Sequence, residues 1–172
     1  MNSERIYIVG FMFSGKSSHG NNLAAAMNRR FLDTDTMLAE QENMSVGEMF
    51  EKNGEKWFRE REKKLLHSLS SLDNVVISTG GGTPVYNDNM SWMLNNGIVV
   101  YLRMDIADIV ERIKNAENLN SRPLLNKIKD NNIEKEITEM MSKRSPVYER
   151  AHITVSGLSF NVDTVRQAIL SL

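Results

Sequence analysis

The sequence lacks cysteine and has no excess of positive charge. With 0 Cys in 172 residues, disulfides and thiolate metal sites are excluded. Lys and Arg total 21 and Asp and Glu total 22, for a formal net charge of -1. Nucleic-acid binding is therefore disfavoured, because such binding relies on basic side chains that neutralise many phosphates. We expect small-molecule partners and no nucleic acid.

Long apolar runs are absent as well. The longest, from Gly97 to Leu102, has the length of a strand rather than of a membrane span. The first residues lack the basic region, the longer apolar stretch and the cleavage site of a signal peptide. No repeat, low-complexity tract or Pro/Ser-rich linker divides the chain. We expect one cytoplasmic domain over residues 1–172, monomeric and without a membrane partner.

Short apolar runs alternate with helical patterns along the chain. Strand patterns lie at residues 6–9, 30–33, 75–78, 98–102 and 152–155. Most of these runs are continuously apolar, which is typical of parallel strands that are covered on both faces. Because helical spacing fills the intervals, the sequence predicts repeated βαβ units and an α/β fold.

Two predicted helices carry charges within their apolar stripes. In the helix at about 55–72, Arg59 and Glu62 share a stripe with leucines, and Arg144 continues the stripe of the helix at about 131–148. A charge on a buried face needs a partner, so these residues are candidates for a site. The alternative is that Arg144 lies past the last buried turn and extends to water. Spacing alone does not choose between the two.

A phosphate-binding motif follows the first predicted strand. Residues 10–17 match G-x-x-x-x-G-K-[ST] and open a helical pattern, as the motif requires. Backbone N–H groups at a helix N-terminus bind phosphate, and Gly15 permits close backbone approach. Lys16 would reach the β- and γ-phosphates and Ser17 would offer a hydroxyl to Mg²⁺. We interpret the segment as a nucleotide site rather than a solvated turn.

Two aspartates end the second predicted strand. If the chain is extended there, Asp33 and Asp35 face the same side and could serve one phosphoryl-transfer site. One would hold Mg²⁺ through water and the other would take a hydroxyl proton. The alternative is that Asp35 caps a helix that begins near Thr36, and the residues alone favour the cap.

Two further segments could contribute to such a site. Three glycines end the segment 78–82, where backbone N–H groups would meet a ligand at the carboxyl end of a strand, although a flexible turn is the alternative. The polar stretch at about 116–129 predicts a lid. Its Arg122 would add positive charge at the phosphates. A surface loop with one solvated arginine is the alternative there.

Taken in order, these motifs resemble the shikimate kinase family along essentially the whole chain. The matching segments are residues 10–17, 33–35, 58–62, 78–82, 122–125 and 144–148. The resemblance implies a P-loop kinase fold, a three-layer αβα sandwich with a five-stranded parallel sheet in the order 2-3-1-4-5. It also implies a substrate-binding helical segment at about 36–65. The implied activity is transfer of the γ-phosphate of ATP to the 3-hydroxyl of shikimate, in aromatic amino acid biosynthesis.

The resemblance also implies individual roles. Asp35 would contact the acceptor hydroxyls and act as the base, with Lys16 and Arg122 as the other catalytic groups. Arg112 would stack on adenine. The implied nucleotide-binding residues are Phe13, Ser14, Gly15, Lys16, Ser17, Ser18, Arg112 and Arg122. The implied acceptor-binding residues are Asp35, Arg59, Gly80, Gly81, Gly82 and Arg144, and Mg²⁺ would bind Ser17 and Asp33.

Three residues depart from the family pattern: Ser18 and Val147 are mild changes, and Phe13 is the one that matters most. The family usually has glycine where Phe13 stands, and a position that needs φ > 0 would strain phenylalanine. Phe13 motivates one rival hypothesis, a nucleotide-binding module that has lost catalysis, although every implied catalytic side chain is present. The other rival is another small P-loop kinase, such as a gluconate or nucleoside monophosphate kinase. Two arginines suit a carboxylate acceptor, and a panel of acceptors with ATP would discriminate between these kinases.

Overall fold

A parallel sheet forms the centre of the molecule, with its strands in the order β2-β3-β1-β4-β5. The computed structural model describes residues 4–116 and 132–172. The strands are β1 (Arg5–Val9), β2 (Arg30–Asp33), β3 (Val75–Ser78), β4 (Ile98–Arg103) and β5 (Ile153–Ser156). Every neighbouring pair runs in parallel. The α/β class and the strand order are confirmed, and each strand lies within one residue of its predicted bounds.

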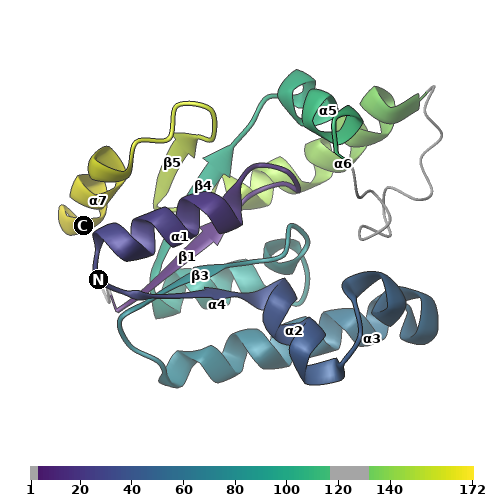
Figure 1. Cartoon of the computed structure of the whole chain (residues 1–172), viewed down its shortest axis with the longest axis horizontal. Coiled ribbons are helices and arrows are strands. Elements are labelled where there is room, and N and C mark those ends of the chain that lie inside the picture. The colour runs from purple at the N-terminus through teal and green to yellow at the C-terminus, as the bar shows by residue number, and fades with distance from the viewer. Residues whose placement is uncertain (1–3, 117–131) are drawn as a thin grey trace.

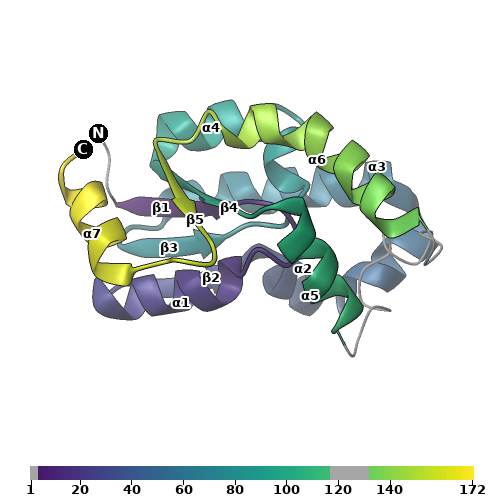
Figure 2. The ribbon, with the colours of Figure 1, turned by 90° about the horizontal axis from the view of Figure 1, so that it is seen from above.

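Helices cover both faces of this sheet, as Figure 1 and Figure 2 show. One face is covered by α1 (Lys16–Ala26) and α7 (Val162–Leu170). The other is covered by α3 (Val46–Ser68), α4 (Asn89–Asn96) and α6 (Ile133–Tyr148). The helices α2 (Thr34–Glu42) and α5 (Ile106–Lys114) lie toward the end at which the strands finish. Short 3₁₀ turns follow α3 at Leu69–Ser71 and β3 at Thr83–Val85.

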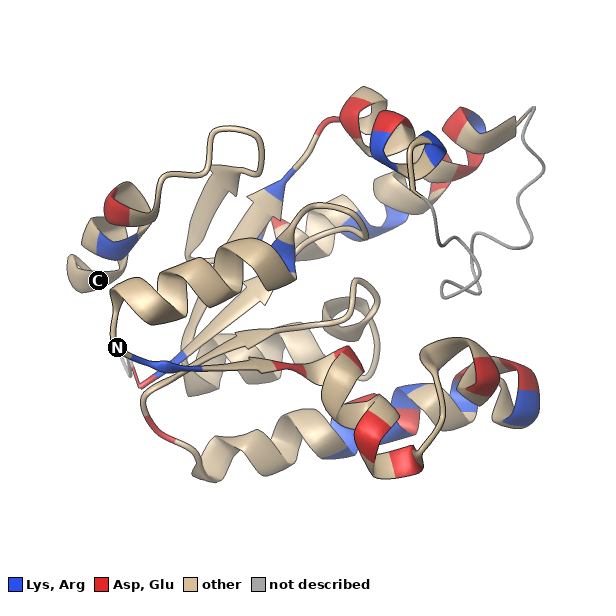
Figure 3. Cartoon of the chain, in the orientation of Figure 1, with Lys and Arg blue, Asp and Glu red and all other residues tan. Residues whose placement is uncertain are grey.

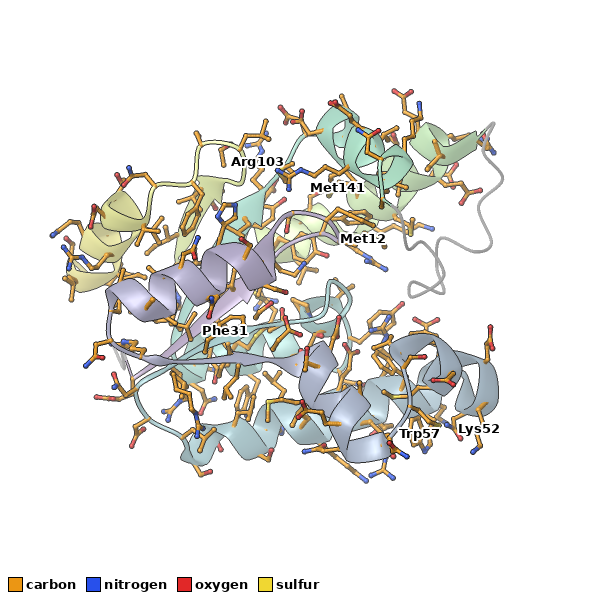
Figure 4. All side chains as sticks on the ribbon, viewed as in Figure 1. Met12, Phe31, Lys52, Trp57, Arg103 and Met141 are labelled. Carbon is orange, nitrogen blue, oxygen red and sulfur yellow. The ribbon has the colours of Figure 1, made fainter. Side chains whose placement is uncertain are left out.

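Each face of the sheet has its own hydrophobic core. Successive side chains of β1 alternate between them, with Ile6 and Ile8 packed under α1 and α7 and Tyr7 in the opposite core. Met12 and Met141, both buried and labelled in Figure 4, belong to that opposite core. The continuous apolar runs in the sequence are thus explained by burial on both sides.

Helix α3 differs from the helix predicted at 55–72. It begins at Val46, where Ser45 and Glu48 form a reciprocal capping box with a 2.7 Å bond from the Ser45 N–H to Glu48. Its backbone is interrupted at Gly54, with φ of 80°, and it ends at Ser68. The apolar stripe in the sequence predicted only the part of α3 that follows Gly54. The helical segment predicted at 36–65 corresponds to α2 and most of α3.

Charged residues of both signs lie mainly on the helices, as Figure 3 shows, and the interior strands carry few. Lys52, labelled in Figure 4, is exposed on α3. No helix within residues 4–116 and 132–172 is long and apolar enough to cross a membrane. The surface is therefore mixed in charge, in agreement with the near-equal totals of 21 basic and 22 acidic residues.

Candidate active site

A cavity of about 580 Å³ surrounds the phosphate-binding loop at the start of α1. Gly15 precedes the helix with φ of 89°, a left-handed conformation that glycine adopts without strain. The cavity is lined by Phe13, Gly15, Lys16, Ser17, Ser18, Asp108, Glu111, Arg112, Asn115, Ala116 and Leu158. All predicted nucleotide-binding residues that the structure describes lie here except Ser14. That side chain is buried, and its hydroxyl has no hydrogen-bond partner among the described residues.

The ammonium group of Lys16 lies inside the phosphate-binding loop. Its Nζ donates a 2.7 Å hydrogen bond to the backbone carbonyl of Phe11, and the residue is buried. A buried ammonium is costly unless anions or acceptors surround it. The loop therefore holds a positive charge close to the helix N-terminus, where backbone N–H groups also attract anions.

Phe13 adopts the left-handed backbone conformation, in which the glycine usual in the family would be unstrained. Its φ is 61°, which is strained for a residue with a bulky side chain. Its carbonyl accepts a 2.8 Å bond from Nη1 of Arg112, which comes from α5. Arg112 thus lines the first cavity, which we call the nucleotide cavity after the predicted residues gathered there, and also supports the strained loop residue. Stacking of Arg112 on adenine stays a prediction.

The strain at Phe13 can be measured by comparing two truncations. Phe13→Gly and Phe13→Ala both remove the ring, but only glycine relieves the positive φ. We expect the glycine variant to be the more stable of the two by about 1 kcal/mol in urea unfolding. The matched control is Ala25→Gly on the exposed side of α1, where glycine should instead cost about 0.5–1 kcal/mol. Equal stabilities of the two Phe13 variants would contradict the strain.

Ser17, which lines the same cavity, is hydrogen-bonded to Asp33. The Ser17 hydroxyl donates to Oδ2 of Asp33 over 2.6 Å. The other oxygen, Oδ1, accepts from the backbone N–H groups of Asp35 at 3.0 Å and Thr36 at 3.2 Å. The cap that the sequence favoured for Asp35 is therefore wrong: Asp33 caps α2, which begins at Thr34, because the chain leaves the extended conformation one residue after Asp33.

The oxygens of Ser17 and Asp33 fit Mg²⁺. This ion takes oxygen ligands, usually one or two from the protein, with water and phosphate oxygens completing its shell. Among the residues that the structure describes, no group of three or more His, Cys, Asp or Glu could hold a metal by itself. A site that depends on nucleotide phosphates for the remaining ligands is consistent with that finding.

A second cavity, of about 320 Å³, brings the predicted acceptor-binding residues together. It is lined by Met12, Asp35, Thr36, Ala39, Ser45, Val46, Phe50, Phe58, Arg59, Glu62, Gly80, Gly81, Gly82 and Arg144. Its residues come from α2, α3, α6 and the loop after β3. Because Met12 lines this cavity and Phe13 lines the first one, both cavities border the phosphate-binding loop.

Arg59 is held between two carboxylates. Nη1 donates to Oε2 of Glu62 over 2.5 Å, as the spacing predicts, and Nη2 donates to Oε1 of Glu55 over 3.0 Å. The ring of Tyr86 lies 4.2 Å from the guanidinium carbon, within cation–π range. Burial would lower the pKa of Arg59, but the two carboxylates raise it above its usual value. The site therefore contains a fixed, charged guanidinium.

Glu62 is the buried partner in this pair. Besides Arg59, it accepts a 2.5 Å hydrogen bond from the hydroxyl of Thr83. Burial raises the pKa of Glu62, as does the nearby charge of Asp35, while Arg59 and Thr83 oppose the rise. Thr83 was not singled out from the sequence. Its only signal was its place directly after the three glycines.

Arg144 faces the same cavity rather than the solvent. It is only 7% exposed, and its guanidinium carbon lies 5.4 Å from the centre of the Phe11 ring. One turn later on α6, the hydroxyl of Tyr148 donates to the carbonyl of Gly81 over 2.5 Å. Burial raises the pKa of Tyr148 to about 12, so the phenol keeps the proton that it donates. The interruption of the apolar stripe thus marks a residue that lines this cavity rather than one that extends to water.

The glycines after β3 are needed because charged groups approach them closely. A Cβ atom on Gly80 would lie 2.7 Å from Oδ1 of Asp35. On Gly82 it would lie 2.5 Å from Nη1 of Arg59. The N–H of Gly80 donates to the hydroxyl of Thr34 over 3.1 Å, so the segment is anchored. This arrangement argues against the alternative of a flexible turn.

A methyl group at Gly82 should disturb acceptor binding. In Gly82→Ala the new Cβ displaces the Arg59 guanidinium, whose contacts on the other sides are already made. We expect the KM for the acceptor to rise about tenfold, roughly the loss of one charge-assisted hydrogen bond. The KM for ATP serves as the internal control and should not change, since Gly82 does not line the nucleotide cavity. An unchanged acceptor KM would contradict the assignment.

The predicted lid and its Arg122 lie outside the described residues. Of the segment at about 116–129, only Ala116 is described, and it lines the nucleotide cavity. The loop after β5, by contrast, is described, and no contact was predicted for it from the sequence. Leu158 of that loop lines the nucleotide cavity.

Comparison with known proteins decides the family. The model of the family described as shikimate kinase matches residues 12–171. The chain belongs to the shikimate kinase family. A shikimate kinase of Clostridium botulinum (strain Okra) is 36% identical over 163 residues, which cover 95% of this chain and 93% of the relative. This membership confirms the resemblance and identifies an enzyme, a kinase that uses ATP to phosphorylate shikimate.

Solved structures agree with the family. The structure described as shikimate kinase from Acinetobacter baumannii in complex with shikimate superimposes with a TM-score of 0.87 at 32% identity. The match covers 98% of this chain and 94% of that one. A gluconokinase from Sinorhizobium meliloti gives a TM-score of 0.57 at 14% identity, covering 99% and 91% of the chains. At that identity the likeness concerns the fold alone, so the rival acceptors receive no better support than shikimate.

Proposed function

We propose that this chain transfers the γ-phosphoryl group of ATP to the 3-hydroxyl of shikimate between its two cavities. The observation that carries the proposal is the arrangement of Asp35, Arg59 and Arg144 around one cavity. Two guanidinium groups suit a carboxylate, which shikimate carries and gluconate also carries. The cavity volume of about 320 Å³ fits a small ring acid.

On the donor side, the phosphate-binding loop would hold the triphosphate. Lys16 and the N–H groups at the start of α1 would stabilise the charge that shifts onto the leaving ADP. Ser17 and Asp33 would hold Mg²⁺, Asp33 through water. When bound, that ion neutralises phosphate oxygens. Arg122, outside the described residues, would add a further positive charge at the phosphates.

On the acceptor side, Asp35 would take the proton of the 3-hydroxyl as its oxygen bonds to phosphorus and the bond to ADP breaks. Arg59 and Arg144 would bind the carboxylate and fix the ring, which supplies the orientation that a bimolecular transfer otherwise lacks. Glu62, Thr83 and Tyr148 would keep these groups in place through the hydrogen bonds described above. A cytoplasmic location and a monomeric state stay predictions.

A coupled assay for ADP release tests the proposal. The protein should turn over ATP rapidly with shikimate and only slowly without an acceptor. Quinate and gluconate serve as controls because both are hydroxylated carboxylates that differ in shape. ATP binding without turnover of any acceptor would favour the lapsed nucleotide-binding module instead. Faster turnover with gluconate would favour the rival kinase.

A further inference from the structure

His19 joins the first turn of α1 to the loop that follows β5. Its Nε2 lies 3.1 Å from the carbonyl oxygen of Gly157. Because a carbonyl only accepts, this hydrogen bond requires the proton on Nε2. The imidazole also stacks on the ring of Phe160, with 4.4 Å between ring centres and 26° between planes. One side chain thus makes two contacts to a loop that is distant in sequence.

The same loop reaches the nucleotide cavity. Leu158, between the two residues that His19 contacts, lines this cavity and is 61% exposed. Gly157 lies against the phosphate-binding loop, since a Cβ there would be 2.9 Å from the carbonyl oxygen of Ser14. Its N–H donates to the carbonyl of Arg103 over 2.8 Å. Two hydrogen bonds anchor the loop at Gly157, one from its N–H to Arg103 and one from His19 to its carbonyl. At the other end, Phe160 stacks on the His19 ring.

We propose that His19 is a positioning residue for nucleotide binding, which holds the segment 157–160 against the phosphate-binding loop so that Leu158 forms one side of the cavity. This inference rests on the proposed function, because it takes the cavity to be the ATP site. Because the loop is anchored, the exposed Leu158 side chain presents an apolar surface that is already positioned before the nucleotide binds. Without the anchor, ordering that loop would subtract from the binding free energy.

Kinetics of three variants test the inference. His19→Ala removes both contacts and should raise the KM for ATP about tenfold, the combined loss of a hydrogen bond and a ring stack. His19→Gln keeps an amide donor near the position of Nε2, and His19→Phe keeps a ring on Phe160. Each should recover part of the loss. The KM for shikimate and kcat should stay within about twofold, because His19 does not line the acceptor cavity.

A second histidine provides the matched control. His67 also stacks on an aromatic ring, that of Trp92 at 4.6 Å, but it lines neither cavity. His67→Ala should leave the KM for ATP unchanged. Calorimetric titration with a non-hydrolysable ATP analogue should reproduce the order of the His19 variants without turnover.

The outcomes separate this inference from the proposed function. Wild-type protein that does not phosphorylate shikimate would refute the function. Wild-type activity together with an unchanged KM for ATP in His19→Ala would refute the positioning role. Equal rises in both KM values, with a lowered Tm, would also refute it, because they would show a general structural role.

Discussion

Replacement of Lys16 by methionine should lower kcat about 10²–10³-fold, the usual effect of removing one group that stabilises transition-state charge. Methionine has a similar length and no charge, so it isolates the ammonium. Lys16 lines the nucleotide cavity at the start of α1, with Nζ on the carbonyl of Phe11. From that position the ammonium group can stabilise the negative charge that develops on the phosphate oxygens during transfer. The measurement is steady-state kinetics with ATP and shikimate.

Folding should survive the Lys16 change. A buried ammonium carries a desolvation cost, and methionine removes that cost together with the bond to Phe11. We therefore expect Tm to move by only a few degrees, about the effect of 1 kcal/mol in a domain of this size. Lys52→Met, the same change at an exposed site on α3, is the matched control and should keep wild-type kcat. A Lys16→Met variant with kcat within threefold of wild type would remove the lysine from the mechanism.

The hydrophobic pattern of the sequence was sufficient to predict the strands of the sheet. The central strands β1, β3 and β4 are buried on both faces and give continuous apolar runs. The edge strands β2 and β5 are partly exposed, but their runs were still sufficient to predict their positions. The order of the strands came from the family resemblance, since periodicity alone does not order parallel strands. The start of α3 was missed because the non-helical Gly54 separates it from the stripe that begins at residue 55, although Ser45 and Glu48 carry the capping-box pattern.

The candidate site was predictable where a residue broke a pattern. Arg59, Glu62 and Arg144 interrupt apolar stripes, and the structure buries all three around one cavity or beside it. The partners Thr83 and Glu55 break no pattern, since a threonine after glycines and a glutamate on an exposed turn are ordinary. Their contacts depend on tertiary packing, which the sequence does not display.

The role of Asp33 shows the limit of local reasoning in another way. Asx residues at the end of a strand can cap a helix or bind an ion, and the sequence favoured Asp35 as the cap. In the structure Asp33 uses one oxygen as the cap and the other to accept from Ser17. Capping by Asp33 leaves the side chain of Asp35 to line the acceptor cavity. Only the cap was assigned to the wrong aspartate, because α2 begins at Thr34, two residues before the start near Thr36 that the sequence suggested.

Asp35→Asn should lower kcat at least 100-fold, since a general base commonly contributes about 10²–10⁴ to the rate. Asparagine keeps the size of the side chain and removes its ability to accept a proton. ATP affinity should not change, because Asp35 lines the acceptor cavity and not the nucleotide cavity. Separate titrations of ATP and shikimate would locate the defect.

The structure also predicts the effect of Asp35→Asn on stability. The charge of Asp35 helps to raise the pKa of buried Glu62, so the two carboxylates repel each other. Removing the charge of Asp35 lowers the pKa of Glu62 and relieves this repulsion in the folded state. The variant should therefore unfold at the same urea concentration as the wild type or at a higher one. Asp73→Asn, on an exposed carboxylate that lines neither cavity, is the control for the chemical change itself.

The kinetic pattern distinguishes a base from a group that only orients the acceptor. A base acts in the transition state, so its loss lowers kcat and kcat/KM together. A group that binds ground state and transition state equally would raise the KM for shikimate and leave kcat intact. The second pattern would leave Asp35 as a binding residue and require another proton acceptor. Among the residues that line the acceptor cavity, Glu62 is the other carboxylate, and its oxygens already accept from Arg59 and Thr83.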